Sequence, residues 1–584
     1  MRYLTLCCDY DGTLAHNGKV SDATIAALEH VLESGRRLVL VTGRELDDLQ
    51  AAFPQLELFE RVVAENGALL YRPASREEKL LAERPPDRFI DLLNGRGVGP
   101  MSVGRVIVAT WEPHEVTVLE AIRDLELELQ VIFNKGAVMV LPASVNKATG
   151  LAAALEEMGL SAHNAVGIGD AENDHAFLSF CECSVAVANA LPMVKETADF
   201  VTSGDHGKGV IELIDELLAD DLAGREDRLT RHHILLGMDA DGREVHVRPY
   251  GVNLLVVGTS GSGKSTVATG LLERLAERKY TFCVIDPEGD YEEFEGAVPL
   301  GTPERAPGLD EVLQLLSKPE QNAVVNLVGL PIADRPSFFL ALLPRLQELR
   351  ARTGRPHWLV VDETHHLLPA AWEPAYLTLP EKLNGLVCIT VHPNLIATAA
   401  LEGVDTIVAL GAHPEVMLRE FSEKVGEPAP LTESVALEPN EALVWLPEEG
   451  RPPFRLRIAP SRTERRRHNR KYAEGELGPD RSFYFRGVEG KLNLHAQNLI
   501  LFLQLADGVD DESWVYHLRQ GDYSRWLEDC VKDKTLAEEA RRVEAMAEVS
   551  PQESRYMIRK VIEEHYTLPA PTSTSIVGTD AAAP

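Results

Sequence analysis

Two aspartates, Asp9 and Asp11, follow a short apolar run and stand directly before a glycine, in the segment LTLCCDYDGTL. On a strand end that curls over, residues i and i+2 can both face one pocket. Phosphate-monoester hydrolysis is among the slowest uncatalysed reactions, and a carboxylate nucleophile divides it into two easier steps. The pair therefore indicates phosphoryl chemistry through an aspartyl-phosphate rather than a plain turn.

Three further segments supply the other groups that this reaction needs. The apolar run RLVLVT ends in Thr42, whose hydroxyl would hold a phosphoryl oxygen. Lys147 lies just before a predicted helix, where its ammonium group would neutralise the phosphoryl group and the nucleophile. A third apolar run ends at Asp170 and is followed by Asn173 and Asp174, whose oxygen atoms suit Mg²⁺.

In this order, the four motifs resemble those of the haloacid dehalogenase superfamily, in its Cof-like and sucrose-phosphatase-like branch. The segment AENGA at Ala64–Ala68 is also characteristic of that branch. The resemblance implies that Asp9 is the nucleophile and Asp11 the general acid/base, and that Thr42 and Lys147 bind the phosphoryl group. It also implies a Mg²⁺ site, whose residues would be Asp9, the Asp11 backbone carbonyl and Asp170, supported by Asn173 and Asp174.

The same resemblance implies a cap domain between the second and third motifs, at about residues 71–142. Its strand-like pieces RVIVATW, LQVIF and AVMVL fit a small α+β lid. Cap domains in this family determine substrate specificity, and the resemblance implies that the substrate is a small sugar phosphate or a phosphoglycolate-like acid.

A second phosphate motif lies far along the chain, in VNLLVVGTSGSGKST. It matches GxxxxGK[ST], in which backbone amides and a helix N-terminus hold the phosphates of a nucleotide. Lys264 would reach the β- and γ-phosphates, and Ser265 would coordinate Mg²⁺. The residues predicted to bind ATP here are Gly258, Ser260, Gly261, Gly263, Lys264, Ser265 and Thr266.

About a hundred residues later, HWLVVDETHHLLP predicts a strand that ends in Asp362 and Glu363. Asp362 would hold Mg²⁺ through water, and Glu363 would polarise the attacking water, which favours ATP hydrolysis over kinase chemistry. The next strand, LVCITVH, places Thr390 or His392 where a γ-phosphate sensor usually lies, although either could be a plain polar strand end.

These features resemble the HerA/FtsK group of P-loop ATPases. FCVIDPEGDY at Phe282–Tyr291 strengthens the match, and ILLGMDADGREVHVRPYG predicts a hairpin with an Asp-Gly turn. The resemblance implies hexameric motors on DNA in which a neighbour's arginine completes the site; Arg419 and Arg345 are the candidates in this chain. A homo-oligomer, a ring included, is one expectation, and nucleic-acid association is another.

Alternating strand-like and helix-like segments predict two α/β domains with parallel sheets and a helical C-terminal region. The Trp514, Trp526, Tyr516 and Tyr523 side chains are expected in the core of that helical region. The predicted segments are a phosphohydrolase at 1–215, a linker at 216–231, a P-loop ATPase at 232–460, a basic linker with helices at 461–568 and a disordered tail at 569–584.

Composition limits the remaining functions. The net charge of −33 argues against broad nucleic-acid binding, although the basic run at 461–471 could make a local contact. No apolar run approaches the roughly 20 residues that cross a bilayer, so we expect no membrane partner and a cytoplasmic protein. The seven cysteines are irregularly spaced and predict reduced, structural thiols.

The leading interpretation is an enzyme with two activities, a Mg²⁺-dependent phosphomonoesterase for a small phosphorylated substrate and an ATPase. One alternative is a kinase–phosphatase pair that acts on a sugar or a nucleic-acid end. Another is a nucleotide-dependent regulatory or DNA-associated module with a vestigial phosphatase site.

Overall fold

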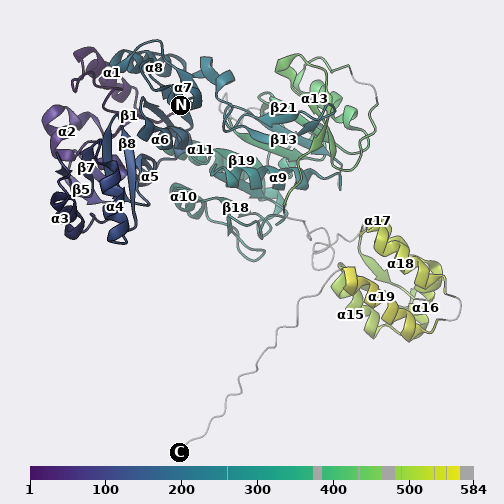
Figure 1. Ribbon diagram of the computed structural model, residues 1–584. Coiled ribbons are helices and arrows are strands. Elements are labelled where there is room, and N and C mark those ends of the chain that lie inside the picture. The colour runs from purple at the N-terminus through teal and green to yellow at the C-terminus, as the bar shows by residue number, and fades with distance from the viewer. Residues whose placement is uncertain are drawn as a thin grey trace, which may run out of the picture. The chain divides into compact units, whose positions relative to one another are not determined.

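The computed structural model forms two compact units, Met1–Arg462 and Thr463–Pro584, which we describe separately (Figure 1). Mixed parallel sheets and helices in the first unit confirm the predicted α/β class. Ser260, most of the basic run at 461–471 and the tail at 569–584 lie outside the described residues. The structure describes residues 1–259, 261–371, 384–431, 434–462, 481–487, 490–531, 533–546 and 549–565.

An eight-stranded sheet forms the centre of the N-terminal domain, in the order β12-β11-β10-β1-β2-β3-β4-β5. Strand β1 (Thr5–Asp9) lies between β10 (Ala165–Gly169) and β2 (Arg37–Val41), and the three strands run parallel. All five residues of β1 are buried, as expected for a parallel strand covered on both faces. The other strands are β3 (Arg61–Ala64), β4 (Leu69–Arg72), β5 (Glu77–Leu80), β11 (Cys183–Ala186) and β12 (Phe200–Val201). The helices are α1 (Asp22–Glu33), α2 (Leu46–Ala52), α5 (Lys147–Met158), α6 (His175–Phe180), α7 (Pro192–Thr197) and α8 (His206–Asp220).

A separate four-stranded antiparallel sheet forms the cap, in the order β6-β7-β9-β8. Its strands include the three pieces expected from the sequence. The cap begins later than residue 71, however, because β4 and β5 pair with the core sheet and not with the cap sheet. The cap elements are α3 (Asp87–Gly95), β6 (Ser102–Val103), β7 (Val108–Trp111), α4 (Glu115–Asp124), β8 (Leu129–Asn134) and β9 (Ala137–Pro142).

The second domain is built on an eleven-stranded sheet, in the order β14-β13-β23-β22-β21-β15-β20-β19-β16-β18-β17. Strands β15 to β21 are parallel, and the antiparallel strands β22, β23, β13 and β14 extend one edge. The predicted Asp-Gly hairpin is confirmed as β13 and β14. The strands are β13 (Ile234–Asp239), β14 (Glu244–Val247), β15 (Leu254–Gly258), β16 (Phe282–Asp286), β17 (Val298–Leu300), β18 (Ala323–Asn326), β19 (Trp358–Val361), β20 (Leu386–Thr390), β21 (Thr406–Leu410), β22 (Glu441–Trp445) and β23 (Phe454–Ile458). The helices are α9 (Lys264–Glu277), α10 (Leu309–Ser317), α11 (Arg335–Thr353), α12 (Thr398–Leu401) and α13 (Pro414–Val425).

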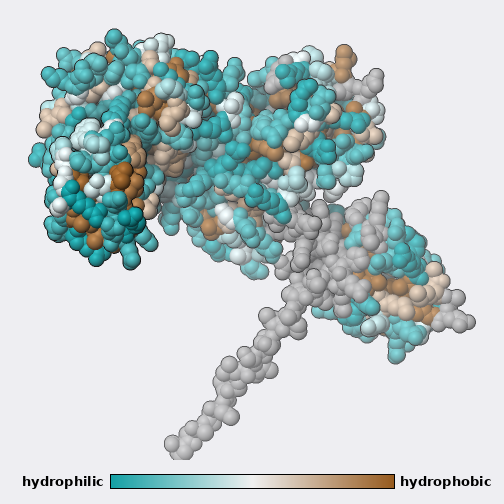
Figure 2. Space-filling model, in the orientation of Figure 1, coloured by the Kyte–Doolittle hydropathy of each residue, from teal (hydrophilic) through white to brown (hydrophobic). Residues whose placement is uncertain are grey.

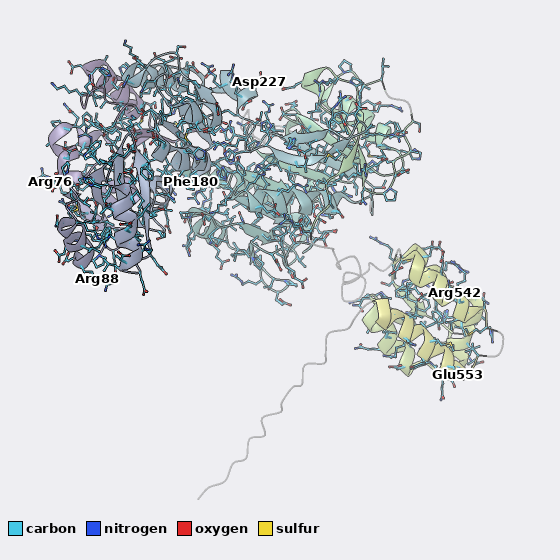
Figure 3. The ribbon with its side chains drawn as sticks, in the orientation of Figure 1. Arg76, Arg88, Phe180, Asp227, Arg542 and Glu553 are labelled. Atoms are coloured by element: carbon cyan, nitrogen blue, oxygen red, sulfur yellow. The ribbon has the colours of Figure 1, made fainter. Side chains whose placement is uncertain are left out.

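The segment between these domains is partly helical, since α8 continues to Asp220 and a 3₁₀ helix spans Ala223–Arg228. Arg231 then donates hydrogen bonds to the carbonyl oxygens of Ser179 and Cys181. These residues flank Phe180, which Figure 3 labels at the end of α6. The predicted linker is therefore bound to the phosphohydrolase core along this stretch.

The second unit packs short helices around an aromatic core. Trp514, Trp526 and Tyr523 are buried as predicted, whereas Tyr516 is 37% exposed. The sequence analysis also missed a small antiparallel pair, β24 (Phe483–Phe485) and β25 (Leu494–Ala496). The helices are α15 (Leu499–Gly508), α16 (Asp511–Gln520), α17 (Asp522–Asp529), α18 (Lys534–Glu544) and α19 (Pro551–His565).

Hydrophilic side chains dominate the face shown in Figure 2, where hydrophobic residues form only small groups. Among the described residues, no helix is both long and apolar enough to cross a membrane.

Candidate active sites

The first candidate site lies where the central strands of the N-terminal sheet end. Asp9 is the last residue of β1, Thr42 directly follows β2, and Asp170 directly follows β10. In parallel sheets these carboxyl ends share one edge, so residues distant in sequence come together there. All three side chains are buried.

Lys147 connects two of the carboxylates in this site. It is the first residue of α5, whose N-cap is Asn146, and its ammonium group donates to Asp9 Oδ1 at 2.6 Å and to Asp174 Oδ1 at 2.5 Å. Burial by itself would lower the pKa of Lys147, but Asp174 and Asp9 raise it above its usual value. Lys147 is therefore a fixed cation beside the predicted nucleophile.

Three buried carboxylates form a group that fits a divalent cation. One oxygen atom each from Asp9, Asp170 and Asp174 lies within 4.8 Å of the others. Burial raises the pKa of Asp9, and the neighbouring Asp174 carboxylate raises it further. Burial also raises the pKa of Asp170. This unfavourable concentration of negative charge is what a bound Mg²⁺ would relieve.

Asp174 and Asn173 lie on a single 3₁₀ turn, Glu172–Asp174, which closely follows Asp170. Asp174 Oδ2 accepts the backbone N–H groups of Asp170 and Ala171 at 2.8 and 2.9 Å. Asn173 donates to the side chain of Asn66, in the AENGA segment, at 3.0 Å. Both residues thus orient the loop that carries Asp170.

Asp11, the predicted general acid/base, makes a bidentate ion pair with Arg44, at 2.6 and 2.7 Å. Arg44 also donates its backbone N–H to the Thr42 hydroxyl at 3.1 Å. The Asp11 side chain is 42% exposed, in contrast to buried Asp9. Arg44 therefore holds the carboxylate at the rim of the site, and the sequence analysis assigned it no role.

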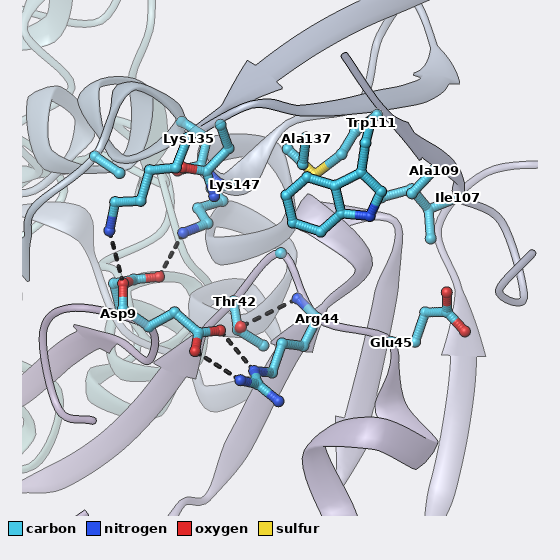
Figure 4. A pocket seen from close by; sticks show the side chains of 16 residues that line it. Asp9, Thr42, Arg44, Glu45, Ile107, Ala109, Trp111, Lys135, Ala137 and Lys147 are labelled. Carbon is cyan, nitrogen blue, oxygen red and sulfur yellow. Dashed lines mark hydrogen bonds and ion pairs between the residues drawn. The ribbon is translucent and has the colours of Figure 1, made fainter. Parts of the chain in front are cut away.

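A cavity of about 370 Å³ lies between these residues and the cap. Figure 4 shows Lys135 above Asp9, and the Trp111 ring to the side of it, above Thr42 and Arg44. The cap wall is largely apolar, and Lys135 is its one cation among the described residues that line the cavity. The cap residues of the lining are Ile107, Ala109, Trp111, Asn134, Lys135, Ala137 and Met139.

Glu65 of the AENGA segment attaches this cap wall to the core. Its buried carboxylate accepts the backbone N–H groups of Arg105, Val106 and Ile107, at 2.8, 2.7 and 2.9 Å. Hydrogen bonds to a charged acceptor are stronger than neutral ones. The motif was recognised in the sequence, but its function as a cap anchor becomes visible only in the structure.

The comparisons with known proteins match the domain that carries this site. The family model described as haloacid dehalogenase-like hydrolase matches residues 6–94 and 106–214. Phosphoglycolate phosphatase 2 of Saccharolobus solfataricus is 30% identical over 232 residues, covering 38% of this chain and 96% of that protein. The chain belongs to the haloacid dehalogenase-like hydrolase family. It is therefore an enzyme, and we call its first part the hydrolase domain.

Two other matches cover a similar share of the chain. Phosphoglycolate phosphatase of Methanothermobacter thermautotrophicus is 33% identical over 218 residues, covering 36% of this chain and 96% of that protein. A solved haloacid dehalogenase-like hydrolase from Bacteroides thetaiotaomicron is 20% identical, with a TM-score of 0.34, and covers 37% of this chain and 99% of that one.

The second candidate site lies at the carboxyl end of β15. Gly258 ends that strand, and Gly261 and Gly263 have φ values of 79° and 100°, which only glycine adopts readily. Lys264 begins α9 and donates to the carbonyl oxygens of Gly258 and Thr259 at 2.9 and 3.3 Å. Ser265 and Thr266 follow in the first turn of α9, so the glycine-rich turn and the helix N-terminus have the predicted arrangement.

Asp362 and Glu363 follow β19, the strand two places from β15 in the sheet. Burial raises the pKa of Asp362 well above its usual value, and the Asp286 and Glu363 carboxylates add to the shift. A bound divalent cation would favour the charged form of Asp362.

His365 connects Glu363 to the strand that was expected to carry a sensor. Its Nδ1 atom lies 3.5 Å from Glu363 Oε2 and 3.2 Å from the Thr390 hydroxyl. His392, the other sensor candidate, instead lies 3.1 Å from Glu420. Burial lowers the pKa of His365 to about 4, and the nearby His366 contributes, so the imidazole is neutral at pH 7. Thr390 therefore contacts His365, which in turn lies beside the predicted catalytic group, Glu363.

The DPEGDY segment closes around Asp286, the last residue of β16. The Asp286 carboxylate accepts four backbone N–H groups between Glu288 and Tyr291, at 2.8 to 3.3 Å.

Of the two arginine candidates, Arg345 pairs with Asp310, and Arg419 is exposed on α13. Residues 252–343 match the family model described as Helicase HerA, central domain, so the chain joins the hydrolase domain to a HerA-type domain.

The two domains contact each other at the amino ends of strands in both sheets. Both candidate sites lie at the other, carboxyl ends. His163 and Glu182 precede β10 and β11 in the hydrolase domain, and Tyr280 precedes β16 in the HerA-type domain. Glu182 accepts hydrogen bonds from Arg2, His163 and Tyr280 at 2.6 to 2.7 Å. His163, Glu182 and His232 have the spacing of metal ligands, but these hydrogen bonds already satisfy the carboxylate.

Proposed function

We propose that the hydrolase domain is a Mg²⁺-dependent phosphomonoesterase that forms an aspartyl-phosphate on Asp9. The supporting observation is the buried Lys147–Asp9 contact of 2.6 Å, beside Asp170 and Asp174 and at a cavity that cap residues line on one side. A bound Mg²⁺ would be held by Asp9, the Asp11 carbonyl and Asp170, and would neutralise charge on the phosphoryl group.

In this proposal each residue of the site has a defined role. An Asp9 oxygen attacks phosphorus, and the bond between phosphorus and the leaving oxygen breaks. Asp11 gives a proton to that oxygen and then takes one from the water that hydrolyses the aspartyl-phosphate. Lys147 and the Thr42 hydroxyl hold the phosphoryl oxygens, and Arg44 must release Asp11 for the proton transfer.

The substrate we propose is a small phosphorylated metabolite such as phosphoglycolate or a sugar phosphate. The cavity of about 370 Å³ suits a molecule of that size. The relatives named above are phosphoglycolate phosphatases, and this name supports an acidic two-carbon substrate for the present chain.

We further propose that the HerA-type domain binds and hydrolyses ATP. The glycine-rich turn would hold the phosphates, Lys264 the β- and γ-phosphates, and Ser265 with Asp362 a second Mg²⁺. Glu363 would polarise the attacking water, in contact with neutral His365. The proposed boundaries remain those of the sequence analysis, with the cap starting after β5. Oligomerisation and nucleic-acid binding remain predictions.

The test measures phosphate release from ATP and from a panel of phosphorylated metabolites in Mg²⁺. Asp9→Asn should abolish only metabolite hydrolysis, and Lys264→Ala only ATP hydrolysis. Loss of ATP hydrolysis in Asp9→Asn alone would contradict the assignment of the ATPase to the second domain. Transfer of labelled phosphate from ATP to an acceptor other than water would favour the kinase–phosphatase alternative, and no metabolite hydrolysis at all would favour the regulatory one.

A further inference from the structure

Lys135 lies at the tip of the cap, in the turn between β8 and β9, and its side chain enters the catalytic site. Its φ of 49° and the glycine that follows it form this tight turn. The ammonium group donates to Asp170 Oδ2 at 2.7 Å and to the Asp11 backbone carbonyl at 3.3 Å. A cap residue thus contacts the core at the edge that carries the nucleophile.

These two oxygens are the ones that we assign to Mg²⁺, together with Asp9. The ammonium group of Lys135 therefore lies where we expect the metal ion, and its positive charge neutralises the Asp170 carboxylate in the metal's absence. Because the ammonium group bridges these two oxygens, it occupies the place between them where a metal ion would bind, and the two like charges repel. Binding of the metal would therefore displace Lys135 from Asp170.

The other cations of the cavity already have carboxylate partners on the core. Arg44 is paired with Asp11 and Asp48, and Lys147 with Asp9 and Asp174. The surrounding cap wall is apolar and includes Ile107 and Met139. An anionic group on the leaving part of a substrate would therefore meet the released Lys135 ammonium group against a cap wall that offers little other polar contact.

We propose that Lys135 determines substrate specificity by binding a carboxylate on the leaving group, after bound Mg²⁺ has displaced it from Asp170. The inference rests on the proposed phosphomonoesterase function and narrows its substrate class to short phosphorylated hydroxy acids. Sugar phosphates with neutral leaving groups would be poorer substrates, because nothing on them replaces the carboxylate contact.

The first experiment measures metal binding and needs no catalysis. Mg²⁺ is titrated into nucleotide-free, full-length protein by calorimetry, with Asp170→Asn used to identify the heat that belongs to this site. Lys135→Gln should bind Mg²⁺ about 3- to 10-fold more tightly than wild type, because a competing cation is gone. Arg123→Gln is the matched control, since it removes an exposed positive charge from the cap outside the cavity. Unchanged or weaker binding in Lys135→Gln would refute the displacement.

The second experiment compares 2-phosphoglycolate with 2-hydroxyethyl phosphate, which has a hydroxymethyl group in place of the carboxylate. Loss of a charge-assisted hydrogen bond should lower kcat/KM of Lys135→Gln for phosphoglycolate about 10- to 100-fold, mainly through KM. The value for 2-hydroxyethyl phosphate should change little. Equal losses for both substrates would refute the carboxylate contact.

The two experiments separate this inference from the function on which it rests. If wild type hydrolyses neither ester, or no phosphomonoester of the panel, the proposed function fails or its substrate class is wrong. Calorimetry would still report whether Lys135 competes with the metal. If wild type hydrolyses both esters and Lys135→Gln matches Arg123→Gln in both assays, the specificity proposal alone is overturned.

Discussion

The imidazole ring of His163 stacks on the phenol ring of Tyr280, with centroids 3.7 Å apart and planes inclined by 17°. His163 belongs to the hydrolase domain and Tyr280 to the HerA-type domain. The His163 nitrogens lie 2.7 Å from Glu182 and 2.7 Å from the Arg278 carbonyl oxygen. The contact joins the amino ends of strands in both sheets, whereas both candidate sites lie at the carboxyl ends.

This contact should make the two domains interdependent in stability. Tyr280→Phe removes the hydroxyl group that donates to buried Glu182 at 2.7 Å. We expect a loss of about 1 to 3 kcal/mol in the free energy of unfolding, because a buried charged acceptor loses a partner. Urea denaturation would measure it, with Tyr516→Phe, at an exposed position of the second unit, as the control. Equal denaturation curves for Tyr280→Phe and wild type would contradict a stabilising contact.

Acidification should weaken the same interface through His357. Its Nδ1 atom accepts the backbone N–H of Thr281 at 2.9 Å, and burial lowers its pKa well below the usual value. A histidine with a lowered folded pKa contributes stability that is present above its unfolded pKa, about 6.5, and that is lost as pH falls below it. His357→Asn keeps an acceptor but does not titrate.

Between pH 7.5 and 5.5 the unfolding free energy of wild type should therefore fall more steeply than that of His357→Asn. The difference in slope should approach about 1.4 kcal/mol per pH unit below pH 6.5. Denaturation at several pH values measures both slopes, and His30→Asn, at an exposed position of α1, provides the control. Parallel slopes in wild type and His357→Asn would show that His357 titrates equally in the folded and unfolded protein.

Loss of the cap anchor should change substrate binding more than chemistry. Glu65→Gln replaces a carboxylate that accepts three backbone N–H groups with an amide that has one acceptor oxygen. We expect the amides of Val106 and Ile107 to exchange hydrogen about 10-fold faster or more. KM should rise several-fold at nearly constant kcat.

Hydrogen exchange and steady-state kinetics check this prediction. Glu77→Gln is the matched control, because Glu77 is exposed on β5 and pairs with Arg72. A fall in kcat without any change in exchange would instead place Glu65 in the chemical step.

Glu363→Gln should separate ATP binding from ATP hydrolysis. An amide cannot take a proton from water, so hydrolysis should fall about 10²- to 10⁴-fold while ATP affinity is retained. Hydrolysis at Asp9 should be unchanged, because the domains meet through the strand ends away from both sites. Binding of a fluorescent ATP analogue and phosphate release measure the two effects. A matching fall in metabolite hydrolysis would reveal coupling that this arrangement does not predict.

The sequence alone predicted which residues lie at the strand ends and at the start of the helix after the glycine-rich turn. Asp9, Thr42 and Asp170 each end an apolar run, and Lys264 begins a helix after a glycine-rich turn. Such motifs are short, and the conformation of each depends on residues that are neighbours in the chain. The α/β class followed from the same alternation of strands and helices, because buried parallel strands require continuous apolar runs.

Only the tertiary structure decided which distant residues meet. Lys135 lies in an ordinary Asn-Lys-Gly turn, and nothing in its local sequence shows that it reaches Asp170. The register of β4 and β5 assigned them to the core sheet, although their sequence alone did not separate core from cap. The His163–Tyr280 stack depends on how two sheets pack, which is a sum of many weak contacts between segments far apart in the chain. The pattern of neighbouring residues in the sequence therefore does not predict how the two sheets pack.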